Sequence, residues 1–330
     1  MKRFFRLATL LTLFALLVSG LYAAPRVIKL TTKFVPAEQT TLSLVKVIDG
    51  INKGSKGALE VQLFDSGTMP IGKDGLELVA QGGDVMCVDG VDFLGDYVPD
   101  FNAIIGPFLY TSFDEYLAMV RTPLVEDLKA KAYEQGIKVL SIDWVFGFRS
   151  MMLKKPVKVP EDMKGINLRV PTSPLYTETI KALGANPIAM SYPDTYAAIQ
   201  SGVIDGVEGS IMTYWGTKQW ENVKEYSLTN HLLGVSAVTI SRKLWESLTP
   251  EQQKLIQEQV DLGAKDNLDA TVASEADFME KLKGVGVNVH EVDADAFNKA
   301  ASVVFTKFPK WTPGIYDKIM VELNKIRGKK

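Results

Sequence analysis

The sequence predicts the α/β fold class, with enough chain for two domains. Between residues 27 and 144, short runs rich in β-branched residues alternate with amphipathic helical patterns. This alternation is typical of strand–helix units on a mostly parallel sheet. Removal of an N-terminal segment, described below, leaves about 300 residues, which is enough for two domains.

In the first half of the chain the pattern predicts four strands and three or four helices. A strand is expected wherever β-branched and apolar residues cluster, and a helix wherever apolar residues recur every three or four positions. The expected strands are residues 27–31, 59–64, 85–88 and 138–144. The expected helices are residues 40–52, 75–81 and 113–135, the last being one helix or two.

The second half continues the alternation of strands and helices. Gly184 and Gly202 follow two helical patterns, and a glycine is favoured just after a helix because it adopts a left-handed conformation easily. The expected helices are residues 173–183 and 194–200. The expected strands are residues 145–154, 168–170 and 234–241. At the last of these the chain is expected to pass back through a hinge to the first domain.

Residues 250–283 form the longest helical pattern of the chain. Thr249 is a suitable N-cap and Pro250 suits the first helical position. Two arrangements fit this pattern: one helix that runs between two lobes, or two consecutive helices on one domain. The expected lobes are residues 25–146 with about 235–274, and residues 147–234 with about 275–330.

The N-terminus has the pattern of a signal peptide. Three basic residues within the first six precede the apolar run 7–18, and small residues follow it. The run is shorter than the roughly 20 apolar residues that span a membrane. We therefore expect residues 1–24 to be cleaved between Gly20 and Ala24, which leaves a soluble protein outside the cytoplasm.

The composition excludes several classes of function. Without residues 1–24 the chain has 34 basic and 39 acidic residues, a net charge of −5, so no nucleic acid is expected as a partner. Cys87 is the one cysteine, which excludes a disulfide framework. His231 and His290 have no histidine or cysteine close in sequence, so a zinc site of ordinary spacing is not expected. No other metal and no cofactor are expected either.

Catalytic motifs are missing as well. The sequence has no Gly-x-Ser-x-Gly elbow and no glycine-rich phosphate loop followed by Lys-Ser or Lys-Thr. Neither histidine has an obvious nucleophile partner in sequence. We therefore expect that the protein is not an enzyme, and a secreted α/β enzyme is only a remote alternative.

Two arginines stand on short apolar segments with little other charge. Arg149 ends Gly147-Phe148-Arg149, and Arg169 lies in Leu168-Arg169-Val170-Pro171. A guanidinium keeps its charge and offers five donors in a fixed geometry, which suits a two-bond contact with a carboxylate. This pattern predicts a cleft that binds an acid, although Arg149 could instead pair with a structural acid such as Glu208.

Several blocks of the sequence resemble one family, the solute-binding proteins of tripartite ATP-independent periplasmic (TRAP) transporters, of the DctP type. The similarity extends over nearly all of the chain after residue 24. The blocks are residues 106–109 (GPFL), 147–149 (GFR), 160–171, 184–187 (GANP), 196–208, 228–231 (LTNH) and 248–252 (LTPEQ).

The resemblance implies a two-lobed periplasmic binding protein, type II-like, with a hinge. Such a receptor closes on a small organic acid and delivers it to a permease driven by an ion gradient. The implied partners are the small and large membrane subunits of that permease, with an accessory periplasmic protein as a further candidate. The implied location is the periplasm.

The resemblance also suggests which residues bind the ligand. The arginine that matches Arg169 forms the main salt bridge to the ligand carboxylate in this family, and the one that matches Arg149 lies beside it. Asp89 falls at a position that often carries an acidic or polar contact, and Tyr192 where an aromatic side chain lines the pocket. Glu208 is expected to orient an arginine or the hinge.

Some features depart from the family pattern and leave a second ligand class open. Gly209 stands where many organic-acid binders have asparagine, so one amide contact is missing. Tyr214 and Trp215 lie between the arginine segments and the hinge, and either line the cleft or belong to the core. A larger apolar or lipid-like ligand, with structural arginines, is therefore the alternative. Other aromatic or apolar residues near the candidate cleft are Trp144, Phe146, Phe148, Met151 and Tyr192.

Overall fold

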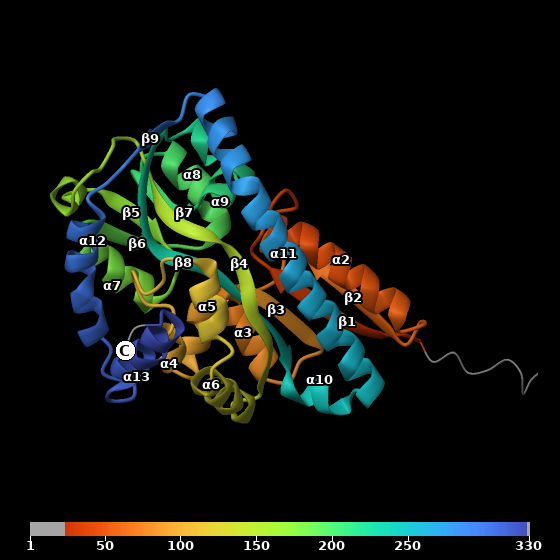
Figure 1. The fold of residues 1–330 in the computed structure, drawn as a ribbon. Coiled ribbons are helices and arrows are strands. Elements are labelled where there is room, and N and C mark those ends of the chain that lie inside the picture. The colour runs from red at the N-terminus through yellow and green to blue at the C-terminus, as the bar shows by residue number, and fades with distance from the viewer. Residues whose placement is uncertain (1–23, 329–330) are drawn as a thin grey trace, which may run out of the picture.

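One sheet extends through both halves of the protein. The computed structural model describes residues 24–328, and its strands have the order β2-β1-β3-β8-β4-β7-β5-β6, with β9 paired to β8. Figure 1 shows the two long strands, β4 and β8, passing from one half to the other. The strands are β1 (Arg26–Thr32), β2 (Leu59–Phe64), β3 (Val85–Gly90), β4 (Ile137–Leu153), β5 (Asn167–Val170), β6 (Asn186–Ala189), β7 (Gly206–Ser210), β8 (Glu225–Ser241) and β9 (Asn288–His290).

The sheet is mixed and not mostly parallel. β1 is parallel to β2 and β3, and β5 is parallel to β6 and β7. β8 is antiparallel to β3 and β4, and β4 is antiparallel to β7. Parallel strand–helix units therefore build each half, and antiparallel pairs occur where the two long strands join the halves. The α/β fold class is confirmed.

Helices cover the sheet by burying one face each. In α2 the buried residues Leu44, Val47 and Ile51 are three and four positions apart and pack on Ile28 of β1. Trp144 belongs to the same core. The helices are α2 (Gln39–Gly54), α3 (Gly72–Ala80), α4 (Asp100–Ala103), α5 (Phe113–Met119), α6 (Pro123–Glu134), α7 (Pro174–Ala182), α8 (Thr195–Gln200), α9 (Ile211–Gly216), α10 (Arg242–Ser247), α11 (Pro250–Gly284), α12 (Ala294–Ala301) and α13 (Ile315–Ile326).

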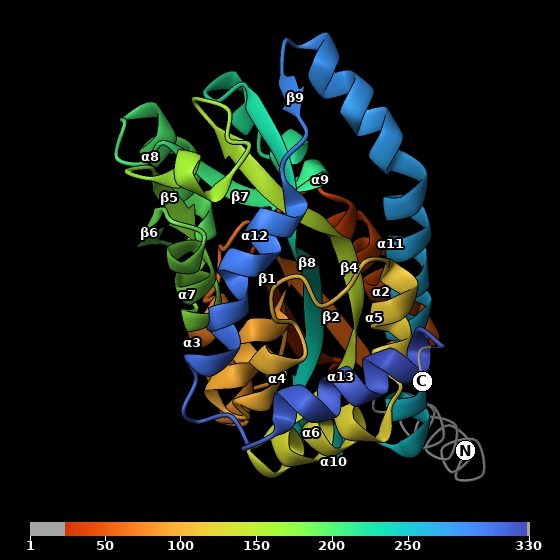
Figure 2. The ribbon, with the colours of Figure 1, turned by 60° about the vertical axis from the view of Figure 1, so that its left-hand side comes forward.

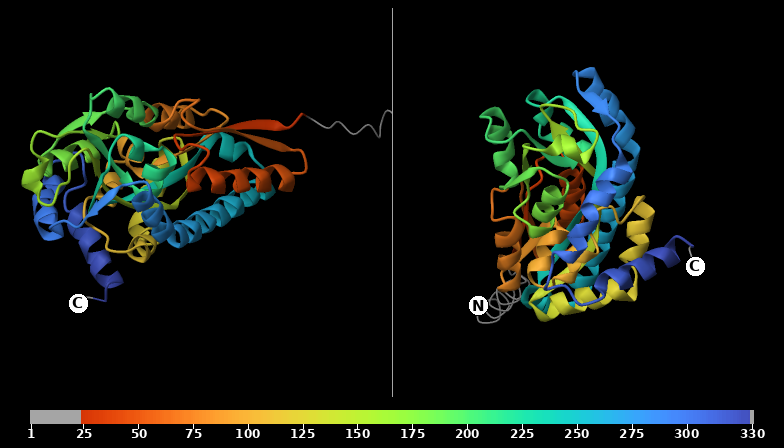
Figure 3. Two further views of the ribbon diagram at one scale, coloured as in Figure 1. Left: turned by 90° about the horizontal axis from the view of Figure 1, so that it is seen from above. Right: turned by 90° about the vertical axis from the view of Figure 1, so that its left-hand side faces the viewer.

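The longest helical pattern is a single helix, α11. Thr249 and Gln252 close its N-terminus with reciprocal hydrogen bonds of 3.3 and 3.0 Å. The helix packs along α2 and β4 in the first half and reaches α9 in the second, and Figure 3 shows it beside α2. Of the two arrangements that the sequence left open, the helix between the halves is the one found.

The chain after α11 contacts both halves again. β9 pairs with β8 and α12 packs on α7, whereas α13 packs on α4 and α5 of the first half (Figure 2). Within residues 24–328 no helix is both long and apolar enough to cross a membrane. The expected signal peptide lies, apart from Ala24, outside the described residues.

The two long strands are irregular where they pass between the halves. Their pairing shifts register four times between Val139 and Met151, and such bulges bend a strand. Gly147 lies within this segment with φ of +111°, a conformation that other residues rarely adopt. A β-carbon there would lie 3.1 Å from the Cβ of Ser210. The segment from Val139 to Met151 is hereafter the waist.

Two strands are longer than the sequence pattern indicated. Residues 138–144 and 145–154 were expected as separate segments, but β4 is continuous because its bulges absorb the irregular pattern. β8 begins at Glu225, nine residues before the expected start at Gly234. Polar residues such as Thr229 and His231 are buried in that added part, so hydrophobicity alone does not indicate a strand there.

Candidate ligand-binding site

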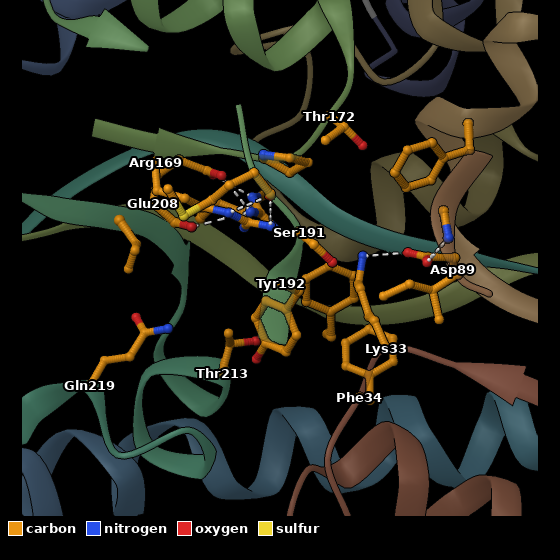
Figure 4. Close-up of a pocket in the computed structure, with 18 residues that line it drawn as sticks. Lys33, Phe34, Asp89, Arg169, Thr172, Ser191, Tyr192, Glu208, Thr213 and Gln219 are labelled. Atoms are coloured by element: carbon orange, nitrogen blue, oxygen red, sulfur yellow. Dashed lines mark hydrogen bonds and ion pairs between the residues drawn. The ribbon is translucent and has the colours of Figure 1, made fainter. Parts of the chain in front are cut away.

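A cavity lies between the two halves and is lined by residues of both (Figure 4). The first half and the waist contribute Lys33, Phe34, Ile71, Gly72, Asp89, Phe93, Phe146 and Arg149. The second half contributes Arg169, Pro171, Thr172, Met190, Ser191, Tyr192, Val207, Glu208, Thr213 and Gln219. Of the seven site residues expected from the sequence, five therefore lie on its wall.

Arg149 is held by an acid of the neighbouring strand. Its Nε lies 2.5 Å from Oε2 of Glu208 and its Nη2 lies 2.6 Å from Oε1, and both side chains are buried. Burial alone would raise the pKa of Glu208, but the charge of Arg149 and a contact with His231 outweigh burial and lower that pKa to about 2. Arg149 thus has the structural partner considered from the sequence, although it still lines the cavity.

Arg169 differs from Arg149 because no acid among residues 24–328 pairs with it. From β5, its Nε and Nη2 both donate to the carbonyl oxygen of Met190, at 3.1 and 2.9 Å, and its guanidinium lies 5.7 Å from the ring centre of Tyr192. Only 4% of Arg169 is exposed, and this burial lowers its pKa to about 10. A buried cation without an ion-pair partner among residues 24–328 favours binding of an anion in the cavity.

Asp89 lies at the opposite side of the cavity in a dense set of contacts. Its Oδ1 lies 2.7 Å from Nζ of Lys33, and its carboxylate accepts the backbone N–H groups of Gly72 and Gly90. Lys33 follows β1 and Asp89 lies near the end of β3. The carboxyl ends of parallel strands are where α/β proteins bind ligands, and this rule could have identified Lys33, which the sequence interpretation missed.

Tyr192 connects the halves at the side of the cavity. Its hydroxyl donates to Oε1 of Glu38 at 3.0 Å, and the N–H of Val35 donates to Oε2 at 2.9 Å. Burial raises the pKa of Glu38 to about 7 against the lowering effect of these hydrogen bonds and of Lys33. Glu38 was not expected from the sequence, because nothing near it in the chain indicates a partner 154 positions away.

Tyr214 and Trp215 do not line the cavity. Tyr214 is fully buried, donates to the carbonyl oxygen of Val223 and stacks on Tyr226. Trp215 stacks on Trp220 at a centroid distance of 5.6 Å. Tyr214 belongs to the core of the second half, and the half-buried Trp215 packs against that core. Thr213 of the same helix faces the cavity instead.

Gly209, at the position of the missing asparagine, lies on β7 beside the cavity wall. A β-carbon there would lie 3.6 Å from Thr213, an ordinary contact distance. Thr213 itself lines the cavity and is fixed by Ser210, whose hydroxyl accepts the N–H of Thr213 and caps α9. The methyl group of Thr213 thus lies near the place where an amide was expected.

Two α/β halves, two strands that cross between them and a cavity lined by both halves define the class of two-lobed solute-binding proteins. The sequence matches the family of bacterial extracellular solute-binding proteins, family 7, DctP, over residues 35–310. The protein belongs to this family. The expected relationship to the TRAP receptors is thereby confirmed.

Solved structures of TRAP periplasmic solute-binding proteins share this fold. One from Fusobacterium nucleatum, with bound sn-glycerol 3-phosphate, is 67% identical; the match covers 92% of this chain and 98% of that chain, with a TM-score of 0.91. One from Desulfovibrio salexigens, in complex with diglycerolphosphate, is 38% identical, with coverage of 92% and 98% and a TM-score of 0.90.

A relative named for its ligand is the 2,3-diketo-L-gulonate-binding periplasmic protein of Escherichia coli. It is 26% identical over 295 residues, which cover 87% of this chain and 90% of the relative. The family consists of substrate-binding receptors and not of enzymes, and TRAP receptors are periplasmic. The protein is therefore a solute-binding receptor of the TRAP type.

Proposed function

We propose that this receptor binds a small organic acid whose anionic group is a phosphate ester, with sn-glycerol 3-phosphate as the first candidate. The observation that carries the proposal is the buried guanidinium of Arg169, which faces the cavity and has no acidic partner within the described residues. Arginine matches the geometry of phosphate as well as that of carboxylate. The two structures of 67% and 38% identity hold phosphate esters of glycerol, which favours phosphate.

A carboxylate is the second candidate for the anionic group. It is favoured by the relative that is named for 2,3-diketo-L-gulonate, an acid without phosphate. Both candidates use the same clamp: Arg169 forms the main ion pair and Arg149 lies beside it, held by Glu208. Asp89 and Tyr192 contact the rest of the ligand. Tyr214 and Trp215 have no part in the proposed contacts.

Closure about the waist completes the site in the proposed mechanism. Ligand enters an open cleft, the second half engages it through Arg169, and closure brings Lys33 and Asp89 of the first half against it. The proposed lobes are residues 25–146 with about 235–274, and residues 147–234 with about 275–330. We assign α13 to the first lobe instead, because it packs on α4 and α5.

The closed receptor delivers its ligand to the small and large membrane subunits of a TRAP permease, and an accessory periplasmic protein is a further candidate partner. Export by the signal peptide of residues 1–24 would place the protein in the periplasm. The support for both proposals is membership of a family of TRAP receptors and the sequence pattern of the N-terminus.

Native mass spectrometry of the purified mature protein identifies what it retains, and calorimetry then measures affinity for sn-glycerol 3-phosphate. A charged hydrogen bond contributes about 1.5 to 3 kcal/mol, so Arg169→Ala is expected to weaken binding at least tenfold. Arg26→Ala is the matched control, because Arg26 pairs with Asp84 at the surface. Retention of an acid without phosphate would instead support the carboxylate. A neutral or lipid-like molecule that Arg169→Ala still retains would overturn the acid clamp.

A further inference from the structure

Glu38 and Tyr192 form a contact between the two halves that the proposed mechanism does not use. Glu38 precedes α2 in the first half, and Tyr192 belongs to the short 3-10 helix Tyr192–Asp194 in the second half. Their hydrogen bond is 3.0 Å long and buried. Because its two partners come from different halves, we expect opening of the cleft to break this contact.

The surroundings of Glu38 are unusual for an acid. The side chain is 4% exposed and forms no ion pair with a cation of the described residues. It also turns away from the N–H groups of α2, which would favour its charge, and accepts the N–H of Val35 instead. Both of its observed donors are neutral groups, so closure removes the carboxyl from water without an opposite charge beside it.

Groups from each neighbouring element act on this carboxyl. Lys33, on the same loop, attracts a negative charge on Glu38, but its Nζ lies 2.7 Å from Asp89 and is paired there. From the second half, α9 presents Thr213 and Gly216, which do not titrate in water. The titratable group of Tyr192 contacts Glu38 directly, and the guanidinium of Arg169 lies 5.7 Å from the centre of the Tyr192 ring.

The second half has a space shaped for Glu38. A β-carbon on Gly216 would lie 2.8 Å from Cγ of Glu38, so a larger residue at this position would force the Glu38 side chain or its surroundings to shift. The free space over Gly216, together with the hydroxyl of Tyr192 and Thr213, forms a recess in the second half that holds the Glu38 side chain. This fit is the second observation, independent of charge, that Glu38 is part of closure.

We propose that Glu38 takes up a proton when the receptor closes on its ligand, so that the contact with Tyr192 makes ligand affinity depend on pH. In the open form Glu38 is exposed to water and its pKa is near the ordinary value of 4.5, whereas burial in the closed form raises its pKa to about 7. The closed form then binds more protons. Affinity is therefore greatest at low pH and is lost as pH rises toward and through about 7.

The size of the effect follows from the two pKa values. Between pH 6 and pH 8 the proton on Glu38 should contribute a change of about tenfold in affinity. The inference rests on the proposed function, because it requires closure around a ligand. It goes beyond that function, because Glu38 does not contact the ligand. Glu38 is a positioning residue: it affects ligand affinity by holding Tyr192, and with it the second half, in the closed form.

The test compares wild type with Glu38→Gln, which resembles the protonated acid in shape and cannot titrate. Affinity for sn-glycerol 3-phosphate is measured by calorimetry at pH 6 and pH 8. Titration of the ligand and of other protein groups affects both proteins alike, so the comparison isolates Glu38. Wild type should lose about tenfold more affinity than the variant across this range. Equal losses would overturn the proposal.

Glu38→Ala removes the carboxyl altogether, and it provides a second variant if Glu38→Gln does not fold. Like Glu38→Gln, it should lose about tenfold less affinity than wild type between pH 6 and pH 8. A loss equal to that of wild type would overturn the proposal. If wild type binds no sn-glycerol 3-phosphate at either pH, only the proposed ligand fails. The same pH comparison then uses the acid that the purified protein retains.

Discussion

Arg149 and Glu208 form a buried ion pair with two hydrogen bonds, 2.5 and 2.6 Å long, between β4 and β7. Arg169 lies on the next strand, β5, and donates only to a backbone carbonyl within the described residues. The negative charge of Glu208 is therefore paired with Arg149 and does not neutralise Arg169. This asymmetry explains why two arginines of similar sequence context have different roles: one is fixed in the sheet, and the other is left for an anion.

Loss of Arg149 should damage the fold more than loss of Arg169. Arg149→Met leaves the carboxylate of Glu208 buried without its main partner, and we expect the free energy of unfolding to fall by about 3 to 5 kcal/mol. Urea denaturation of ligand-free protein measures this change. The double variant Arg149→Met/Glu208→Gln should recover part of the loss. A single variant as stable as wild type would contradict the structural role.

Lys33 should matter more for a doubly charged ligand than for a singly charged one, because it adds a third basic side chain to the cavity, after Arg149 and Arg169. Lys33→Met is expected to lower the affinity for sn-glycerol 3-phosphate by about tenfold and the affinity for glycerate by less, as measured by calorimetry. Lys46→Met, which removes an exposed lysine paired with Asp266, is the control and should change neither affinity. Equal losses of affinity for both ligands would show that Lys33 does not distinguish ligands by their charge.

Tyr214 should affect stability and not binding. Tyr214→Phe removes the hydrogen bond to the carbonyl oxygen of Val223 and leaves that acceptor buried, which costs about 1 kcal/mol. Thermal unfolding should detect this loss, while the affinity for ligand stays within twofold of wild type. A clear drop in affinity at unchanged stability would contradict this role and support Tyr214 as a ligand-binding residue.

Gly147 should not tolerate a side chain. Gly147→Ala forces a residue with a β-carbon to adopt φ of +111° and places that carbon 3.1 Å from Ser210, so we expect a loss of more than about 1 kcal/mol in unfolding free energy. Gly284→Ala is the control, since Gly284 ends α11 with open space around it. Chemical denaturation of both variants checks the difference. Similar stability for the two would contradict strain at the waist.

Local patterns predicted many elements well, because they depend on residues close in sequence. The strand at residues 59–64 was expected with its observed bounds, and residues 113–135 do form two helices, α5 and α6. Arg149 and Arg169 were noticed because charge is rare on their apolar segments. The first part of β8 was missed because its polar residues, among them Thr229 and His231, are buried only through pairing with β4 and packing around it.

The sequence by itself determined the α/β class, the family and the two arginines of the site, since periodicity and motifs are properties of neighbouring residues. Tertiary structure decided which arginine has an acid partner, that Tyr214 belongs to the core and Trp215 packs against it, and that Lys33 faces the cavity. It also brought Glu38 to Tyr192 across 154 positions. The physical reason is that ion pairing and burial depend on how two halves pack, and no local pattern records that packing.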